Sequence, residues 1–319
     1  MLRRSMLTGL AAVAGSRSGI AAASQAIQDG TALSSEVVVD RPPGGKPHAG
    51  KVLAAIQPHC DDIPLFAAGA VIRLIDEGYT AHLIRVTNDD MAGPGTTGNT
   101  VLENERDNQA VARALGCQRV FDLNYSNHQM DQESRLEMRA RFIFLFRLLQ
   151  VDTVVCYDPW GHYEENPDHA VTAQVVEAAC WMAGGAKDYP EHFAAGLQAH
   201  GVREKYYFAR GPQLVNRVMD ISSVIDRKVA VNRLNVTQGP AGQSGAALRK
   251  SLAARGLRIP MLGDDDETAA NNYVKHYVLQ RDKEVGARHG LAFAEPYHYI
   301  GPPALSGEDF IRKNAVPLR

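Results

Sequence analysis

The chain has 319 residues, of which 45% are hydrophobic and 22% are charged. This composition is typical of a globular protein with a large core and excludes a chain that is disordered over most of its length. Its 34 Lys and Arg residues against 36 Asp and Glu residues give a formal net charge of -2 at pH 7. Because so balanced a chain has no global positive field, we expect no nucleic-acid partner.

The N-terminus has the pattern of an export signal. Arg3 and Arg4 precede a weakly hydrophobic run of small residues that contains no acidic residue and ends in three alanines at Ala23. Paired arginines before such a run favour the twin-arginine route, which exports folded proteins. We expect residues 1–23 to be this signal, residues 24–49 a leader, and the mature protein to be periplasmic or secreted. The alternative is a basic N-terminus on a cytosolic helix.

The rest of the chain alternates between strand and helix patterns. Short apolar runs bounded by turn residues predict buried parallel strands, and amphipathic stretches between them predict helices. The predicted strands are 51–56, 81–87, 119–123 and 153–157, and the predicted helices are 65–77, 103–115, 133–149 and 170–181. This alternation indicates an α/β fold, a Rossmann-like, mostly parallel sheet with helices on both faces.

We expect one domain over residues 50–319, with a mobile insertion at 237–272 beside the cleft. No later stretch reaches the roughly 20 apolar residues of a membrane span, so we expect no stable membrane insertion once the signal is removed.

Several common functional signatures are missing from this sequence. The Gly-rich segment 93–98 lacks the Gly-Lys-Ser/Thr ending of a P-loop, and no Gly-x-Gly-x-x-Gly follows the first strand, so a nucleotide site is not predicted. The four cysteines, Cys60, Cys117, Cys156 and Cys180, form no Cys-x-x-Cys pair, which excludes a redox motif and a zinc ribbon. Because three of them lie within or beside apolar segments, we expect free thiols rather than two disulfides.

Two clusters of histidine and aspartate follow two of the predicted strands. His59 and Asp62 come directly after strand 51–56, and His169 lies in the loop after strand 153–157. Because the carboxyl ends of parallel strands meet at one edge, both loops should border one cleft. Two imidazoles and one carboxylate leave a position open for water, which is the catalytic pattern of a zinc site. Fe²⁺ and other divalent ions also bind such a set.

The other polar residues of these loops predict hydrolytic chemistry. A divalent metal lowers the pKa of its water ligand to about 7, so a neighbouring carboxylate can take the proton. Asp61 is the candidate general base, which later returns the proton to a leaving amine. Asp168 is placed to orient a ligand imidazole, and His162 and Tyr163 are candidates for stabilising an oxyanion.

Helix capping is the competing interpretation. An aspartate at a helix start accepts hydrogen bonds from free backbone N–H groups, so Asp61, Asp62 and Asp168 could each be a cap. His59 alone would be an ordinary hydrogen-bonded loop residue. Two His/Asp clusters at one cleft edge are harder to explain as caps, which favours the metal site.

On these residues the chain resembles the PIG-L/LmbE family of zinc-dependent N-acetylglucosaminide deacetylases. The family's His-Pro-Asp-Asp-Glu motif corresponds to His59-Cys60-Asp61-Asp62-Ile63, and its His-Pro-Asp-His motif corresponds to Asn166-Pro167-Asp168-His169. Weaker likenesses at 228–238 and 293–295 extend the resemblance to about residues 50–300. The resemblance implies a Rossmann-like fold, metal binding by His59, Asp62 and His169, and a general base and acid at Asp61. It also implies that Tyr163, displaced by one residue, helps to stabilise the oxyanion.

Three residues depart from the family pattern. Cys60 replaces a proline, Ile63 a glutamate and Asn166 a histidine. Asn166 can donate a hydrogen bond but cannot carry positive charge, so we expect a different turnover or pH dependence. The function implied is removal of an acetyl group from an N-acetylated amino sugar or glycoconjugate. The alternatives are a carbohydrate-binding relative that has lost turnover, and a metal hydrolase of another acylated amine.

Overall fold

The computed structural model describes residues 37–302 and 307–317. The predicted export signal lies outside these residues. The compact unit that contains the sheet begins at Val38. Its first strand, β1 (Val38–Asp40), lies within the segment predicted as a leader and pairs with β7 (Arg217–Asp220).

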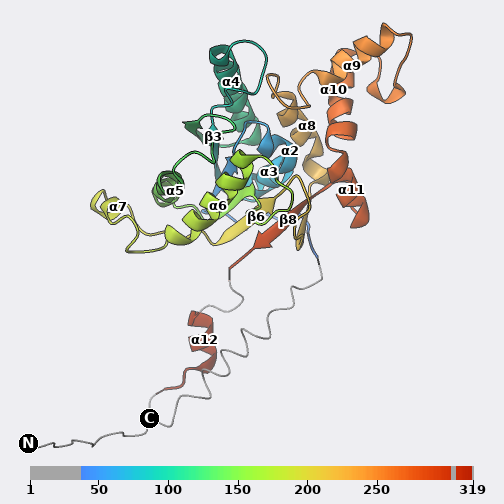
Figure 1. The fold of residues 1–319 in the computed structure, drawn as a ribbon. Coiled ribbons are helices and arrows are strands. Elements are labelled where there is room, and N and C mark those ends of the chain that lie inside the picture. Colours follow the sequence, from blue (N-terminus) through green and yellow to red (C-terminus); the bar gives the residue numbers. More distant parts are fainter. Residues whose placement is uncertain (1–36, 303–306, 318–319) are drawn as a thin grey trace, which may run out of the picture. The chain divides into compact units, whose positions relative to one another are not determined.

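An eight-stranded sheet forms the centre of this unit (Figure 1). Five parallel strands run in the spatial order β4-β3-β2-β5-β6. They are β2 (Val52–Gln57), β3 (Thr80–Thr87), β4 (Arg119–Tyr125), β5 (Thr153–Tyr157) and β6 (Glu204–Phe208). β8 (Ala294–Ile300) pairs antiparallel with both β6 and β7. The prediction of a mostly parallel α/β sheet is therefore confirmed.

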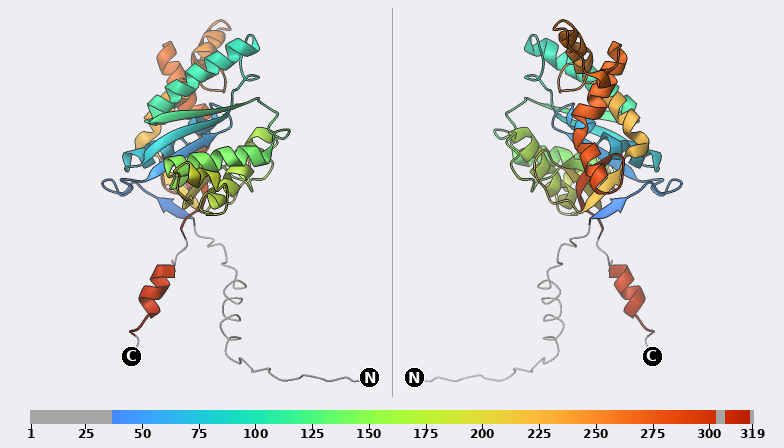
Figure 2. Two further views of the ribbon diagram at one scale, coloured as in Figure 1. Left: turned by 90° about the vertical axis from the view of Figure 1, so that its left-hand side faces the viewer. Right: turned by 90° about the vertical axis from the view of Figure 1, so that its right-hand side faces the viewer.

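Helices cover both faces of the sheet (Figures 1 and 2). On one face, α3 (Ala68–Asp76), α4 (Thr97–Leu115) and α8 (Ile225–Arg233) pack together, and on the other α5 (Arg135–Leu149) packs against α6 (Pro167–Met182). The chain runs from β2 outward through β3 to β4 and then returns to β5 on the other side of β2. This reversal creates a topological switch point between β2 and β5, which is where open α/β sheets bind ligands.

The core is built around the two strands at this switch point. Ala54 of β2 lies opposite His82 of β3 on one side and Val154 of β5 on the other. Because helices cover both faces, β2 and β5 are continuous apolar runs rather than alternating ones. All four cysteines are free thiols, as expected.

A buried ionic cluster joins α3 to the C-terminal part of the sheet. Glu295 of β8 accepts hydrogen bonds of 2.8 Å from the backbone N–H groups of Gly69 and Ala70 at the start of α3. Lys228 lies 2.7 Å from Glu295 and 2.6 Å from Asp282 of α11 (Gln280–Arg288). A buried charge is costly unless it is paired with opposite charges and hydrogen-bonded, as each charge is here. Two segments with family likeness, 228–238 and 293–295, therefore meet in a structural contact at Lys228 and Glu295.

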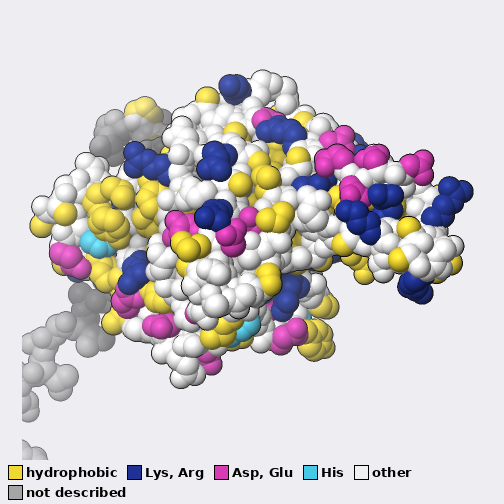
Figure 3. All heavy atoms as spheres, turned by 90° about the horizontal axis from the view of Figure 1, so that it is seen from above, with side chains coloured by type: hydrophobic (Ala, Val, Ile, Leu, Met, Phe, Trp, Pro, Cys, Tyr) yellow, Lys and Arg dark blue, Asp and Glu magenta, His cyan; other side chains and the backbone are white. Residues whose placement is uncertain are grey.

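The predicted insertion is largely helical. Its helices α9 (Ser244–Ala253) and α10 (Asp266–Tyr273) pack together and project at the upper right of Figure 1. Arg249 and Lys250 pair with Asp266, and acidic and basic side chains are intermixed on this projection and on the rest of the face in Figure 3. The remaining elements are α2 (Asp62–Phe66), α7 (Glu191–Ala194), α12 (Gly307–Asn314), short 3-10 turns at Ser222–Val224 and Pro260–Leu262, and a π-helical turn at Val274–Val278. Among residues 37–302 and 307–317, no helix is long and apolar enough to cross a membrane.

Candidate metal centre

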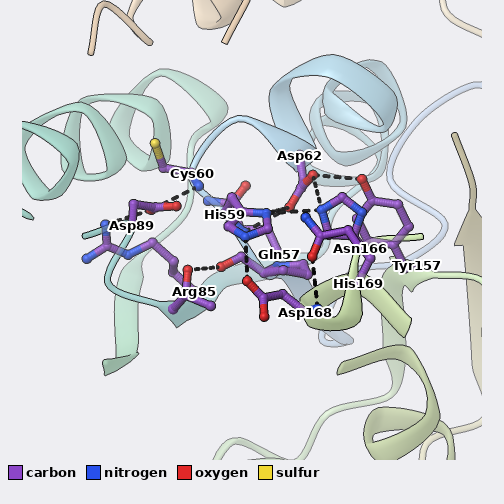
Figure 4. A network of polar contacts seen from close by, with 12 residues as sticks. Gln57, His59, Cys60, Asp62, Arg85, Asp89, Tyr157, Asn166, Asp168 and His169 are labelled. Atoms are coloured by element: carbon purple, nitrogen blue, oxygen red, sulfur yellow. Dashed lines mark hydrogen bonds and ion pairs between the residues drawn. The ribbon is translucent and has the colours of Figure 1, made fainter. Parts of the chain in front are cut away.

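His59, Asp62 and His169 meet at the switch point (Figure 4). His59 follows β2, Asp62 opens α2 and His169 lies in the first turn of α6. Their exposed fractions are 6%, 3% and 3%, and one ligand atom from each lies within 4.8 Å of the others. His59 Nδ1 is 3.0 Å from His169 Nε2. Asp62 Oδ2 lies 3.4 Å from His59 Nδ1, and Asp62 Oδ1 lies 3.4 Å from His169 Nε2. The structure thus brings together the three residues predicted as ligands.

The chemistry of these three residues suits a cation. Two imidazole nitrogens that face each other at 3.0 Å cannot both present lone pairs unless a proton or a cation lies between them. Burial disfavours the charged form of Asp62, but His169 and His59 nevertheless lower the pKa of its carboxyl to about 2, so it is ionised. Imidazole and carboxylate are normal ligands of zinc and of other divalent ions. A divalent cation therefore fits here, held by His59, Asp62 and His169.

Each ligand imidazole has a carboxylate beside its other ring nitrogen. Asp168 Oδ2 lies 3.0 Å from His59 Nε2 and Glu164 Oε1 lies 3.1 Å from His169 Nδ1. The second contact is electrostatic, since His169 Nδ1 has no well-aligned hydrogen-bond partner. Arg210 holds Glu164 from the other side at 2.6 Å. Such carboxylates fix the orientation of metal-binding histidines. The sequence pattern predicted this role for Asp168 and missed Glu164, whose only signal is a carboxylate shortly before His169.

Helix capping does not explain the predicted catalytic carboxylates. Asp61 is the N-cap residue of α2, but its side chain makes no capping hydrogen bond. At α6 the cap is Asn166, whose Oδ1 accepts a hydrogen bond of 2.9 Å from the backbone N–H of Asp168. Asp62 Oδ2 accepts one of 2.8 Å from the N–H of His59 and so also closes the turn that presents both ligands. The Asp61 and Asp168 carboxylates are therefore available to the site.

Asp61 lies beside the metal ligands and beneath the start of the insertion. Its burial and the negative charge of Asp62 raise the pKa of its carboxyl to about 7. Gly239 lies directly against it, since a Cβ at this position would be 2.9 Å from Asp61 Oδ2. Gly239 also has a φ of +80°, which favours glycine. The adjacent Gln238 donates a hydrogen bond of 3.0 Å to Cys60 Sγ. The first residues of the predicted insertion thus border the site.

Tyr157 is a site residue that the sequence pattern did not predict. It ends β5, and its hydroxyl donates a hydrogen bond of 2.7 Å to Asp62 Oδ1. Its ring stacks on His169 with the ring centroids 4.1 Å apart. Burial and the charge of Asp62 raise the pKa of its hydroxyl well above the usual range, so it remains a neutral donor. Its position at the carboxyl end of the strand before the second motif is the one sequence signal.

Two departures from the family motif occupy core positions. Cys60 and Ile63 are fully buried. Burial raises the pKa of the Cys60 thiol well above its ordinary value, and its sulfur points away from the metal ligands in Figure 4. A thiolate ligand at Cys60 is therefore not supported. Ile63 packs in the core, and its backbone N–H donates a hydrogen bond of 3.1 Å to Gln57 Oε1.

The structure does not bring every predicted catalytic side chain to the metal ligands. The Oδ1 atom of Asn166 is used in the helix cap. His162 is exposed and its backbone N–H donates a hydrogen bond of 2.9 Å to the carbonyl of Pro212. Tyr163 is 86% exposed, with a φ of +60°. The role of His162 and Tyr163 in stabilising an oxyanion stays a prediction, and the observed role of Asn166 is to begin α6.

The fold and the site define a Rossmann-like α/β protein with a two-histidine, one-aspartate candidate metal centre. Residues 54–180 match the PIG-L family, described as GlcNAc-PI de-N-acetylase, and this stretch contains all three ligands. The diacetylchitobiose deacetylase of Thermococcus kodakarensis is 26% identical over 197 residues, which are 60% of this chain and 71% of the relative. Residues 54–180 are therefore similar to the PIG-L family, and the resemblance stated from the motifs is confirmed.

Solved structures with this fold have more than one activity. The N,N'-diacetylchitobiose deacetylase from Pyrococcus horikoshii has a TM-score of 0.63 and 18% identity, over 80% of this chain and 87% of that one. GalB, the 4-carboxy-2-hydroxymuconate hydratase from Pseudomonas putida, has a TM-score of 0.57 and 16% identity, over 81% of this chain and 99% of that one. Because one fold hosts a deacetylase and a hydratase, the reaction must be argued from the site.

We predict that metal binding depends on the three ligands. Purified protein analysed by mass spectrometry of metals should contain one divalent ion per chain, and His169→Ala should lose it. Glu164→Gln should retain the site but bind metal about 10- to 100-fold more weakly, since its carboxylate orients His169. His162→Ala, a change of an exposed histidine in the same loop, should bind like the unsubstituted protein. Full metal content in His169→Ala would show that the site is wrongly placed.

Proposed function

We propose that the protein is a zinc-dependent N-deacetylase that removes an acetyl group from an N-acetylated amino sugar or glycoconjugate. The observation that supports this most is Asp61, a carboxylate free of any capping bond beside the ligands His59, Asp62 and His169. Two histidines and one carboxylate form the open ligand set of hydrolytic zinc enzymes. The family description as a de-N-acetylase and the relative that is a diacetylchitobiose deacetylase support an N-acetyl sugar as the substrate.

The residues around the site have separate roles in amide hydrolysis. When bound, a divalent cation supplies a Lewis acid and lowers the pKa of water toward 7. Asp61 takes a proton from the attacking water and delivers it to the amide nitrogen as the C–N bond breaks, so that acetate and a free amine are released. Tyr157 holds Asp62 through its neutral hydroxyl, and Asp168 holds His59. These contacts keep the ligand atoms oriented without rearrangement during the reaction.

A non-catalytic carbohydrate-binding role is the second candidate. It is favoured by the placement of Asn166 and Tyr163, since the first begins a helix and the second extends into solvent. In this structure neither Asn166 nor Tyr163 offers a charged hydrogen-bond donor to an oxyanion. The retained Asp61 carboxylate favours the catalytic proposal, because binding of a sugar alone does not need a general base.

The predicted activity can be separated from metal binding at Asp61. Zinc-loaded protein should release acetate from N,N'-diacetylchitobiose, and Asp61→Asn should lower kcat by about 10²- to 10⁴-fold because the proton acceptor is lost. The variant should keep its metal, as measured in the same preparation. Metal-loaded protein that releases no acetate from N,N'-diacetylchitobiose or from N-acetylglucosamine would favour the binding role. An Asp61→Asn variant with full activity would refute the assignment of the base.

We also propose that residues 1–23 direct export by the twin-arginine route. Replacing Arg3 and Arg4 with lysine should leave the full-length precursor in the cytoplasm, because this route reads the arginine pair. Cell fractionation and the size of the protein on a blot measure this. Arg17→Lys lies outside the pair and should be exported normally. Normal processing of the double variant would exclude this route.

A further inference from the structure

An exposed imidazole stands beside the metal ligands on the loop after β4. The ring centroid of His128 lies 6.4 Å from that of His59, with the ring planes at 64°. His128 is exposed, whereas His59 is buried. A molecule that arrives from solvent therefore meets the ring of His128 before the ring of His59.

Two carboxylates from different elements fix the backbone of this loop. Asp168 Oδ2 accepts hydrogen bonds both from the backbone N–H of His128, at 2.7 Å, and from His59 Nε2, at 3.0 Å. On the other side, Asp90 Oδ1 accepts a hydrogen bond of 2.9 Å from the backbone N–H of Asn127. The carboxylate that orients a metal ligand therefore also fixes the position of His128.

The backbone of His128 has a positive φ, a conformation that residues other than glycine seldom adopt. Its φ is +58°, within the left-handed region that only a few per cent of residues other than glycine adopt, histidine being one of the residues enriched there. Backbone strain of this kind persists where the surroundings hold it, and it concentrates at active sites. Here the hydrogen bonds that Asp168 and Asp90 accept from the backbone of His128 and Asn127 fix this conformation. The hydrogen bonds of this loop therefore fix the imidazole of His128 beside His59.

On the basis of the proposed deacetylase function, we propose that His128 is a catalytic residue that contacts the substrate. Its ring N–H donates a hydrogen bond to the acyl oxygen of the N-acetyl group, and this bond strengthens as negative charge gathers on that oxygen. Imidazole has an N–H donor in either protonation state, so the contact does not require a charged ring. His128 thereby supplies the imidazole that the second motif of this chain lacks at Asn166.

The test compares His128→Asn with a change at the next residue. Asparagine tolerates the left-handed backbone, so His128→Asn removes the ring and keeps the loop. With N,N'-diacetylchitobiose, kcat should fall about 10²-fold, as when one oxyanion donor is removed, with KM and metal content unchanged. Gln129→Ala, at the exposed neighbour, should leave kcat unchanged. In His128→Gly, added imidazole should raise kcat.

The outcomes separate this proposal from the deacetylase proposal. An active enzyme whose kcat is unchanged in His128→Asn overturns the role of His128 alone. A loss of kcat that comes with a loss of metal, and that imidazole does not rescue in His128→Gly, assigns the residue to loop structure and also overturns it. Metal-loaded protein without acetate release overturns the deacetylase function itself, and with it the substrate contact.

Discussion

The hydrogen bond between Asp168 and His59 is the contact on which the rest of the site depends. Asp168 is fully buried, and its carboxylate joins the helix after β5 to the turn after β2 at 3.0 Å. It turns His59 Nδ1 toward His169 and anchors the backbone of His128. A buried carboxylate is costly unless it has several donors, and here donors from the loops after β2 and β4 meet on one side chain. The topological switch point makes this possible, because it places β2 and β5 side by side while their connections diverge.

Much of the first half of the fold could be predicted because its pattern is local. The runs at β2 and β5 are apolar on both faces, and turn residues bound them. The later strands lack that signal. β8 contains Glu295, a charge within a buried strand, and this burial makes sense only with Lys228 and the start of α3 beside it. β1 is three residues long and is defined by its pairing with β7. Long-range partners determine these elements, so composition and periodicity alone do not reveal them.

The site also combines residues that local sequence patterns predict with residues that long-range contacts position. His59, Asp62 and His169 were predictable because two short motifs fall at the ends of adjacent strands. Tyr157 and His128 were not, because each owes its place to a contact with another loop rather than to a spacing in the sequence. The family pattern also gives incomplete guidance where this chain departs from it. A histidine of the second motif is replaced by Asn166, whose side chain begins α6, and a different loop places the exposed imidazole of His128 beside His59.

Anomalous diffraction from crystals of the zinc-loaded protein tests the metal centre most directly. Data collected above and below the zinc absorption edge should show one strong peak at the switch point. The peak should lie about 2.0–2.2 Å from His59 Nδ1, from a carboxylate oxygen of Asp62 and from His169 Nε2, which are normal zinc–ligand distances. A zinc ion bound elsewhere in the chain, or no peak between these three side chains, would contradict the proposed centre and the hydrolytic function built on it.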